Sequence, residues 1–403
     1  MRSTALVVVV LLCCIMVIAC SQRESKTHDM VRLLRSSLAR FFNSVPEIPA
    51  DLECLPHNGN DPIVIPLKAD SNGIFTMQLF VGNCAHDTAA RHTSRDANGR
   101  RCWTPHIVAV DTGSEALVLS GDRCASAQLP GSKACSLPAV KTQEKAPTDE
   151  LVYGSQHDRV EWQTKKVLLR SWRMTCDTSD DDAALTTSDD SSYTPHCVVG
   201  EVKAAIVHRR TGTSNYSILG LGNGGTGVHS FLAKLFPNAR RRSFSIHVHS
   251  RQKARLILYN DGRITCNEPR HRIPISKTRS HHHLVRMKSL ELLKGNTPPH
   301  KLDIKRTPDL LLDTGANALS APSAIFDLLQ SKQTGQLRIT LEDDEGEDFT
   351  LQFNFDLNNR RNNQVIDSGG SKKLIVGVSS LVNYAVGVEY RDSGERYVTL
   401  DYF

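Results

Sequence analysis

The feature that most constrains this chain is a short motif that occurs twice, each time after a run of apolar residues. Residues 107–114 read Ile-Val-Ala-Val-Asp-Thr-Gly-Ser, and residues 309–316 read Asp-Leu-Leu-Leu-Asp-Thr-Gly-Ala. An apolar pair and a glycine follow each copy, at residues 218–220 and again at residues 375–377. One Asp-Thr-Gly after a strand is ordinary turn chemistry. A matched pair predicts two related lobes that each supply one carboxylate.

The rest of the chain has the sequence pattern of short β-strands. Apolar runs bounded by Gly, Pro, Asn or Asp predict strands at residues 63–65, 74–81, 107–110, 167–169, 244–248 and 256–258. Helical candidates are few and short, at residues 228–235, 323–329 and 379–383. We therefore expect an all-β protein with an N-terminal lobe over residues 61–260 and a C-terminal lobe over residues 261–403.

The first sixty residues predict an export signal and a candidate pro-segment. Arg2 precedes an apolar run at residues 5–19, which is too short to span a bilayer and typical of a cleaved signal peptide over residues 1–20. An uncleaved signal anchor and a lipid-attachment box ending at Cys20 stay open as alternatives. Residues 21–60 hold a short basic amphipathic stretch and three prolines, which fits either a pro-segment or an N-terminal extension of the mature domain.

Composition and cysteine usage place the chain outside the cytoplasm. With no second apolar run, we expect no stable membrane span after signal removal, and a secreted or lumenal protein, with lysosome or vacuole among the compartments. Three of the 11 cysteines leave with the signal, and eight form an even set suited to disulfides. Disulfides Cys84–Cys102 and Cys176–Cys197 would each close a surface insertion, over residues 83–106 and 177–192.

Other charged and polar stretches point to no further ligand. The net charge of +6 comes from interleaved charges and does not indicate a nucleic-acid partner. Three adjacent histidines at residues 281–283 cannot all face one ion, so a solvated basic loop is expected, with no metal and no cofactor. A glycosylation sequon at residues 215–217 predicts a glycoprotein.

The residue types of the repeated motif suit acid–base hydrolysis. An Asp at the end of a buried strand is held rigidly, and the glycine two residues on lets backbone N–H groups approach the carboxylate. If two such turns face each other, the carboxyl groups share one proton. One Asp then acts as base on a water and the other as acid toward a carbonyl oxygen, without metal or covalent intermediate.

At these residues the sequence resembles the pepsin-like aspartic proteases, over roughly residues 63–403. Residues 152–155, Val-Tyr-Gly-Ser, resemble the flap of the family, and residues 218–222 and 375–377 resemble the segments that pack behind the active-site loops. The resemblance implies a two-lobed pepsin-like fold with an active-site cleft between the lobes. It also implies a monomeric aspartic endopeptidase, made as a zymogen, that cleaves extended protein or peptide substrates at apolar residues.

The resemblance assigns roles residue by residue. The catalytic pair is Asp111 and Asp313. Site support is expected from Thr112, Ser114 and Thr314, and substrate contacts are expected from Gly113, Tyr153, Gly154, Ser155, Ile218, Gly315 and Ala316. Cys124 and Cys135 occupy the places of a small disulfide-closed loop in the family, which leaves Cys54 and Cys266 as the last pair.

Several positions depart from the family pattern. Val118 stands where the family usually has Trp, and Gln156 and His157 replace the glycine-rich continuation of the flap. No Lys or Arg occurs between Arg40 and Lys68, so we expect weak or absent self-inhibition by the pro-segment. A catalytically inactive pepsin-like binding or inhibitor protein is the alternative, although both motifs are intact. A structural β-rich surface protein would leave the paired motif unexplained.

Overall fold

A computed structural model of the chain describes residues 55–56, 62–82, 103–114, 116–120, 149–153, 156–174, 193–211, 217–222, 232, 236, 238–262, 269–276, 283–293, 299–302, 308–358 and 365–402. All of them belong to one compact unit, residues 48–403. The eight cysteines of the expected disulfides have no described side chain, so the disulfide predictions fall outside this part of the chain, as do the signal peptide and the candidate pro-segment.

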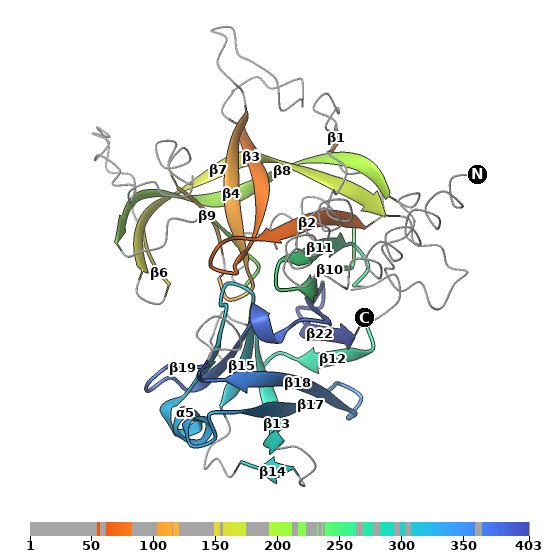
Figure 1. The fold of residues 1–403 in the computed structure, drawn as a ribbon. Helices are drawn as coiled ribbons and strands as arrows, with labels where there is room; N and C mark the ends of the chain where they lie inside the picture. Colours follow the sequence, from red (N-terminus) through yellow and green to blue (C-terminus); the bar gives the residue numbers. More distant parts are fainter. Residues whose placement is uncertain are drawn as a thin grey trace, which may run out of the picture. The chain divides into compact units, whose positions relative to one another are not determined.

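The described residues are predominantly β and form two sheets (Figure 1). The larger sheet contains β1 (Leu55–Pro56), β2 (Ile63–Ala69), β3 (Phe75–Gly82), β4 (Trp103–Asp111), β5 (Leu117–Ser120), β6 (Asp149–Tyr153), β7 (Gln156–Met174), β8 (Tyr193–Thr211), β9 (Ser217–Gly220), β10 (Arg241–Ser250), β11 (Lys253–Tyr259), β12 (His271–Pro274), β21 (Tyr384–Arg391) and β22 (Arg396–Tyr402). The smaller sheet contains β13 (Leu284–Leu293), β14 (His300–Lys301), β15 (Asp309–Asp313), β16 (Leu319–Ala321), β17 (Thr334–Glu342), β18 (Asp348–Asp356), β19 (Val365–Asp367) and β20 (Lys373–Gly377). The helix α5 (Ser323–Gln330) and a 3₁₀ turn at Val378–Ser380 complete the ordered elements.

The strands form where the side-chain pattern favours a pleated sheet. In β18, Phe349, Leu351, Phe353 and Phe355 are buried and alternate with more exposed residues, which is the period of a strand with one covered face. In β4, residues 108–110 are buried without alternation, because this strand lies between β3 and β9 and is covered on both faces.

The two sheets repeat one strand arrangement. The neighbouring strands β8-β5-β9-β4-β3 of the larger sheet match β19-β16-β20-β15-β13 of the smaller sheet in order and in the direction of every pairing. The registers match as well, because Asp111 pairs with Gly220 and Asp313 pairs with Gly377. The sequence repeat therefore corresponds to a repeat of structure.

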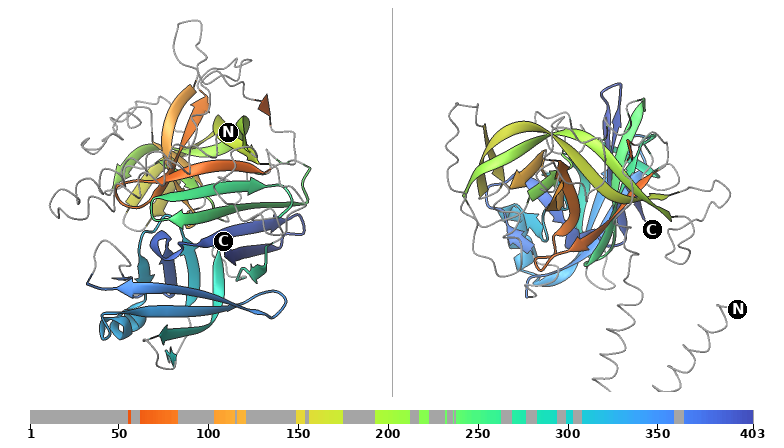
Figure 2. Two further views of the ribbon diagram at one scale, coloured as in Figure 1. Left: turned by 45° about the vertical axis from the view of Figure 1, so that its right-hand side comes forward. Right: turned by 90° about the horizontal axis from the view of Figure 1, so that it is seen from above.

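Strands from the end of the chain return to the larger sheet. β21 pairs with β10, β22 pairs with β21, and β12 pairs with β22, all antiparallel. Figure 2 shows the blue strands β21 and β22 continuing the layer formed by β2, β11 and β10. The last residues of the chain therefore contribute to the same sheet as the first strand after residue 62.

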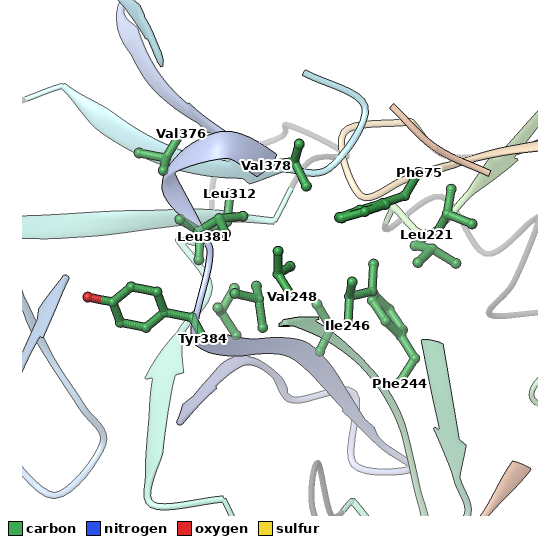
Figure 3. Close-up of a cluster of buried hydrophobic side chains, with 14 of the residues drawn as sticks. Phe75, Leu221, Phe244, Ile246, Val248, Leu312, Val376, Val378, Leu381 and Tyr384 are labelled. Carbon is green, nitrogen blue, oxygen red and sulfur yellow. The ribbon is translucent and has the colours of Figure 1, made fainter. Parts of the chain in front are cut away.

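A continuous apolar core lies beneath the two repeated motifs (Figure 3). It combines Phe75 and Leu221 with Leu312, Val376 and Leu381. These side chains come from both copies of the repeat, and all five are at most 6% exposed. Packing of this kind fixes the strand ends that carry the two Asp-Thr-Gly turns.

Most local expectations are confirmed, with informative differences. Five of the six expected strands lie within β2, β4, β7, β10 and β11, the sixth begins one residue before β3, and α5 confirms the helix at residues 323–329. The expected helix at 379–383 is instead a short 3₁₀ turn, and only residue 232 of the expected helix at 228–235 is described. The expected insertion at 83–106 is too long by at least four residues, because β4 begins at Trp103. None of the described helices is long and apolar enough to cross a membrane.

A buried carboxylate ties the strands of the larger sheet together. Glu389 of β21 is fully buried and accepts hydrogen bonds from Nε of Arg241 at 2.8 Å, of Arg272 at 2.8 Å and of Arg391 at 2.7 Å. Burial alone would raise the pKa of Glu389, but the three guanidinium groups outweigh it and hold the pKa below its usual value. The cluster joins β10, β12 and β21.

We predict that Glu389→Gln lowers the free energy of unfolding at pH 7 by about 1.5–3 kcal/mol, because three partly buried guanidinium groups lose their hydrogen-bonded counter-charge. The folded-state pKa is lowered, so the carboxylate stabilises the fold above pH ~4.3, its unfolded pKa, and this contribution is lost as the pH falls through the folded pKa. Urea unfolding at pH 7 and at pH 3 measures the difference, which should shrink in acid. Glu395→Gln is the matched control, since the exposed Glu395 carboxylate near Arg391 should contribute less than about 1 kcal/mol.

Candidate active site

Each aspartate of the repeated motif stands at the end of a strand that pairs in parallel with a second strand. Asp111 ends β4 beside Gly220, and Asp313 ends β15 beside Gly377. Backbone bonds hold the following turns, from Leu221 N–H to Asp111 O at 2.8 Å and from Val378 N–H to Ala316 O at 2.8 Å. The buried strands and these bonds fix the position of both side chains.

Two threonines lock the turns to each other. Thr112 Oγ1 donates to Leu312 O at 2.7 Å and accepts from the N–H of Thr314 at 2.9 Å. Reciprocally, Thr314 Oγ1 donates to Val110 O at 2.8 Å and accepts from the N–H of Thr112 at 3.2 Å. Both threonines are at most 3% exposed, so water does not compete for these four bonds.

The glycines bring the two carboxyl groups together. A methyl group at Gly113 would lie 2.6 Å from Oδ2 of Asp313, and one at Gly315 would overlap the carboxyl group of Asp111. Each glycine therefore faces the carboxyl group of the opposite turn, at a distance that no other residue type allows. The structure thus brings Asp111 and Asp313 side by side from positions 202 residues apart, the same separation as between Thr112 and Thr314.

Hydrogen bonds and burial give the pair its acid–base character. Backbone N–H groups donate within each turn, from Gly113 to Asp111 Oδ1 at 2.7 Å and from Gly315 to Asp313 Oδ1 at 2.9 Å. Both residues retain some accessible surface, but the carboxyl group of Asp313 lies deep among protein atoms. Burial, the charge of Asp111 and a hydrogen bond with Asp111 together raise the pKa of Asp313 well above its usual value. One proton held between the two carboxyl groups is the natural state of such a pair.

The two turns differ in one donor. Ser114 Oγ donates a hydrogen bond to Asp111 Oδ2, whereas Ala316, at the matching place, has no side-chain donor for Asp313. Together with the raised pKa of Asp313, this asymmetry makes the two carboxyl groups chemically distinct.

Of the remaining expected site residues, the structure describes some and not others. Tyr153 and Gln156 face each other in the register of the β6–β7 hairpin, at its turn, while Gly154 and Ser155 fall outside the described residues. Ile218 lies in β9, is 7% exposed and packs in a small cluster with Val118. Val118 itself is fully buried.

One contact at the rim of the site was not expected from the sequence. Asn317 Nδ2 donates to the carbonyl oxygen of Asn72 at 2.8 Å, which joins the Asp313 turn to the β2–β3 turn. Gly73, with φ of +79°, leaves room for this amide, because a methyl group there would lie 2.9 Å from Asn317. The sequence signal available was Asn-Gly, which marks a turn but not its partner.

The histidine run was interpreted wrongly for His283. His283 is 3% exposed, and its Nε2 lies 3.2 Å from the hydroxyl of Tyr390, so it belongs to the interior and not to a solvated loop. His281 and His282 lie outside the described residues. Within the part of the chain that the structure describes, no group of His, Cys, Asp and Glu side chains could hold a metal ion.

Comparison with known proteins adds no relative to this geometry. The chain matches no protein-family model and no curated protein sequence. The functional conclusion therefore rests on the residues and contacts described above.

We predict that Thr112→Val, which keeps the shape but removes the hydroxyl group, lowers the free energy of unfolding by about 1–3 kcal/mol. The reason is that the Leu312 carbonyl and the Thr314 N–H group would stay buried without their partner. Chemical denaturation measures the change, and Thr314→Val should give a similar loss because its bonds are reciprocal. Thr340→Val is the control, because Thr340 lies on the partly exposed face of β17, and it should change the free energy of unfolding by less than about 0.5 kcal/mol. Equal stability of all three variants and the native chain would contradict the locking role.

Proposed function

We propose that this chain is an aspartic endopeptidase of two pepsin-like lobes, which hydrolyses peptide bonds with a water activated between Asp111 and Asp313. The observation that carries the proposal is the contact of each motif glycine with the carboxyl group of the opposite turn. This arrangement holds two carboxyl groups around one proton, which is what direct attack by water on an amide requires.

The asymmetry of the pair supports a division of roles. Asp111, with hydrogen bonds from Gly113 and Ser114, is the base that takes a proton from the water as its oxygen attacks the carbonyl carbon. Asp313, whose pKa is raised, is the acid that donates its proton to the carbonyl oxygen. When the tetrahedral intermediate breaks down, Asp111 donates its proton to the amide nitrogen as the C–N bond breaks, and Asp313 takes a proton from a hydroxyl group of the intermediate as the carboxylic acid product forms. Both carboxyl groups return to their initial protonation state.

The surroundings of the pair support an extended peptide as substrate. The β6–β7 hairpin, whose turn includes Tyr153, is the proposed flap over a cleft between lobes at residues 61–260 and 261–403, with Gly113, Gly315 and Ala316 on the floor. The exposed Val152 in this hairpin is suited to apolar substrate side chains. Secretory-pathway localisation, with a signal peptide over residues 1–20, disulfides and a glycan at Asn215, belongs to the same proposal.

We predict that Asp111→Asn and Asp313→Asn each reduce the turnover of peptide substrates below about 1% of the native value, because either amide removes half of the proton-sharing pair. Cleavage of a mixed peptide library between pH 3 and pH 7 measures activity, and thermal unfolding verifies the fold. Asp309→Asn is the matched control, since Asp309 begins the same strand β15 and should leave turnover unchanged. Native-like turnover in either catalytic variant would exclude the two-aspartate mechanism. A native chain that cleaves nothing, yet binds a statine-type inhibitor, would favour the inactive binding protein.

We predict that Ala316→Ser shifts the acid limb of the kcat profile toward lower pH by about one unit, because a new hydroxyl donor stabilises the ionised form of the pair. Ser114→Ala removes the donor that Asp111 has and should move the same limb toward neutral pH. The two kcat profiles, measured with Asp111 and Asp313 unchanged, test the direction of both shifts. Profiles that coincide with the native one would refute the hydrogen-bond explanation of the asymmetry.

A further inference from the structure

A buried ion pair lies at the base of the proposed flap and has no role in the chemistry described above. Asp158 of β7 stands opposite Leu151 of β6, two register positions from the pair Tyr153 and Gln156 at the turn. Its side chain is fully buried and accepts two hydrogen bonds from Arg210 of β8, at 2.8 Å from Nε and 2.7 Å from Nη2. The Arg210 side chain is itself only 9% exposed.

The carboxylate occupies a place where the strand pattern calls for an apolar residue. Asp158 and Val160 are two residues apart on β7 and both are buried. His157, before them, and Arg159, between them, are exposed. A buried ion pair contributes little net stability compared with apolar residues of similar size, but it demands one geometry. The bidentate contact therefore determines orientation more than it contributes to stability.

A β-bulge turns the arginine toward its partner. Arg159 pairs with Arg209, whereas the next residue, Val160, pairs with Val207, so β8 carries one extra residue, His208. With the bulge, Val207 and Arg210 both turn inward and Arg209 is exposed. His208 is held on the outside by Glu161 at 2.9 Å. The bulge thus selects Arg210, and not Arg209, as the partner of Asp158.

The arginine also reaches the framework of the catalytic turn. Arg210 Nη1 donates to Ser120 Oγ at 3.4 Å, and the N–H of Ser120 donates to Ser217 Oγ at 3.0 Å. Ser120 ends β5, which follows the Asp111 turn, and Ser217 begins β9, which pairs with β4 as far as Asp111. One guanidinium group therefore contacts both the hairpin and the strands that position Asp111.

Apolar packing under the hairpin is slight. The buried cluster there consists of Ala, Val and Ile side chains only, with Leu151 and Trp162 packed at its edge. The small Val118 leaves this cluster without a large aromatic anchor. Side chains of this size bury little area and fix an angle poorly, so beyond the backbone pairing of β7 with β8, which the bulge at His208 interrupts, the Asp158–Arg210 contact is the directional interaction that orients the hairpin.

We propose that Asp158 and Arg210 are a positioning pair, which sets the orientation of the β6–β7 hairpin relative to the Asp111 turn and thereby the binding of substrate under the hairpin. The catalytic part of this statement rests on the proposed function, while the structural part does not. The pair acts through the hairpin and touches no reacting atom.

The test uses single variants and one neutral double variant of the full chain. Asp158→Asn and Arg210→Met each break the pair, and Asp158→Leu combined with Arg210→Met replaces it by apolar side chains that remove the unpaired charge. Glu150→Gln is the matched control, because Glu150 and His157 form a solvent-exposed pair at 3.1 Å in the same hairpin. Hydrogen exchange of residues 149–160 reports the hairpin, and exchange of β17 and β18 reports the rest of the fold.

In both single variants we expect amide exchange at residues 149–160 to quicken by at least about tenfold, with β17 and β18 unchanged. For peptide substrates we expect KM to rise about tenfold, while kcat stays within about threefold of the native value and the acid limb of the kcat–pH profile does not move. The double variant should regain the native unfolding midpoint but keep the fast exchange and the raised KM. Glu150→Gln should match the native chain in every measurement.

Three outcomes would overturn the proposal. Exchange at residues 149–160 within about twofold of native in both single variants would show that the pair does not hold the hairpin. Native exchange and a native KM in the double variant would show that apolar side chains at these two positions orient the hairpin as well as the ion pair does. Faster exchange with unchanged KM would separate the hairpin from substrate binding. A native chain without peptidase activity would contradict only the proposed function, because the exchange comparison still decides whether the pair holds the hairpin.

Discussion

The four hydrogen bonds that the hydroxyl groups of Thr112 and Thr314 make across the two turns are the constraint on which the rest of the site depends. Each hydroxyl donates to the strand that carries the other motif and accepts the N–H of the other threonine. Breaking any of these four bonds would loosen the contact between the two turns, and with it the contact between the carboxyl groups. Because the threonines are buried, the alternative to these bonds is an unpaired polar group in the interior. The distance between the carboxyl groups is therefore set by the backbone and does not depend on side-chain freedom.

The repeated five-strand arrangement explains how two distant segments reach this contact. In each half a central strand ends in the motif, a parallel neighbour ends in Gly220 or Gly377, and the next backbone N–H supports the turn. A side chain at Gly377 would lie 2.6 Å from the carbonyl oxygen of Ala316, so the close approach of the two strands requires glycine there. The shared core beneath both turns, with Leu221 and Leu381, makes the halves one packing unit.

The sequence predicted the strands and the repeated motif, which depend on local residue patterns. It did not predict the partners of buried polar side chains, which come from distant parts of the chain. Apolar runs predicted the strands that include residues 63–65 and 244–248, and the repeat predicted the pairing of Asp111 with Asp313. The arginines around Glu389 come from three strands, and nothing in their spacing distinguishes them from solvated charges. His283 was misjudged for the same reason, since the residues before it in sequence are polar while its partner, Tyr390, lies 107 residues away.

The two copies of the repeat differ at a few positions, and these differences make the two carboxyl groups unequal. A perfectly symmetric pair of carboxyl groups would have no preferred acid, but Ser114 supplies a side-chain donor to Asp111 that Ala316 cannot supply to Asp313, and burial beside the charge of Asp111 raises the pKa of Asp313. The first half also extends into the β6–β7 hairpin, whose register with β8 contains the bulge at His208. In the smaller sheet, the matching strand β19 is three residues long and ends the sheet. Among the described residues, symmetry thus sets the contact of the two carboxyl groups, and asymmetry gives each carboxyl group a different set of neighbours.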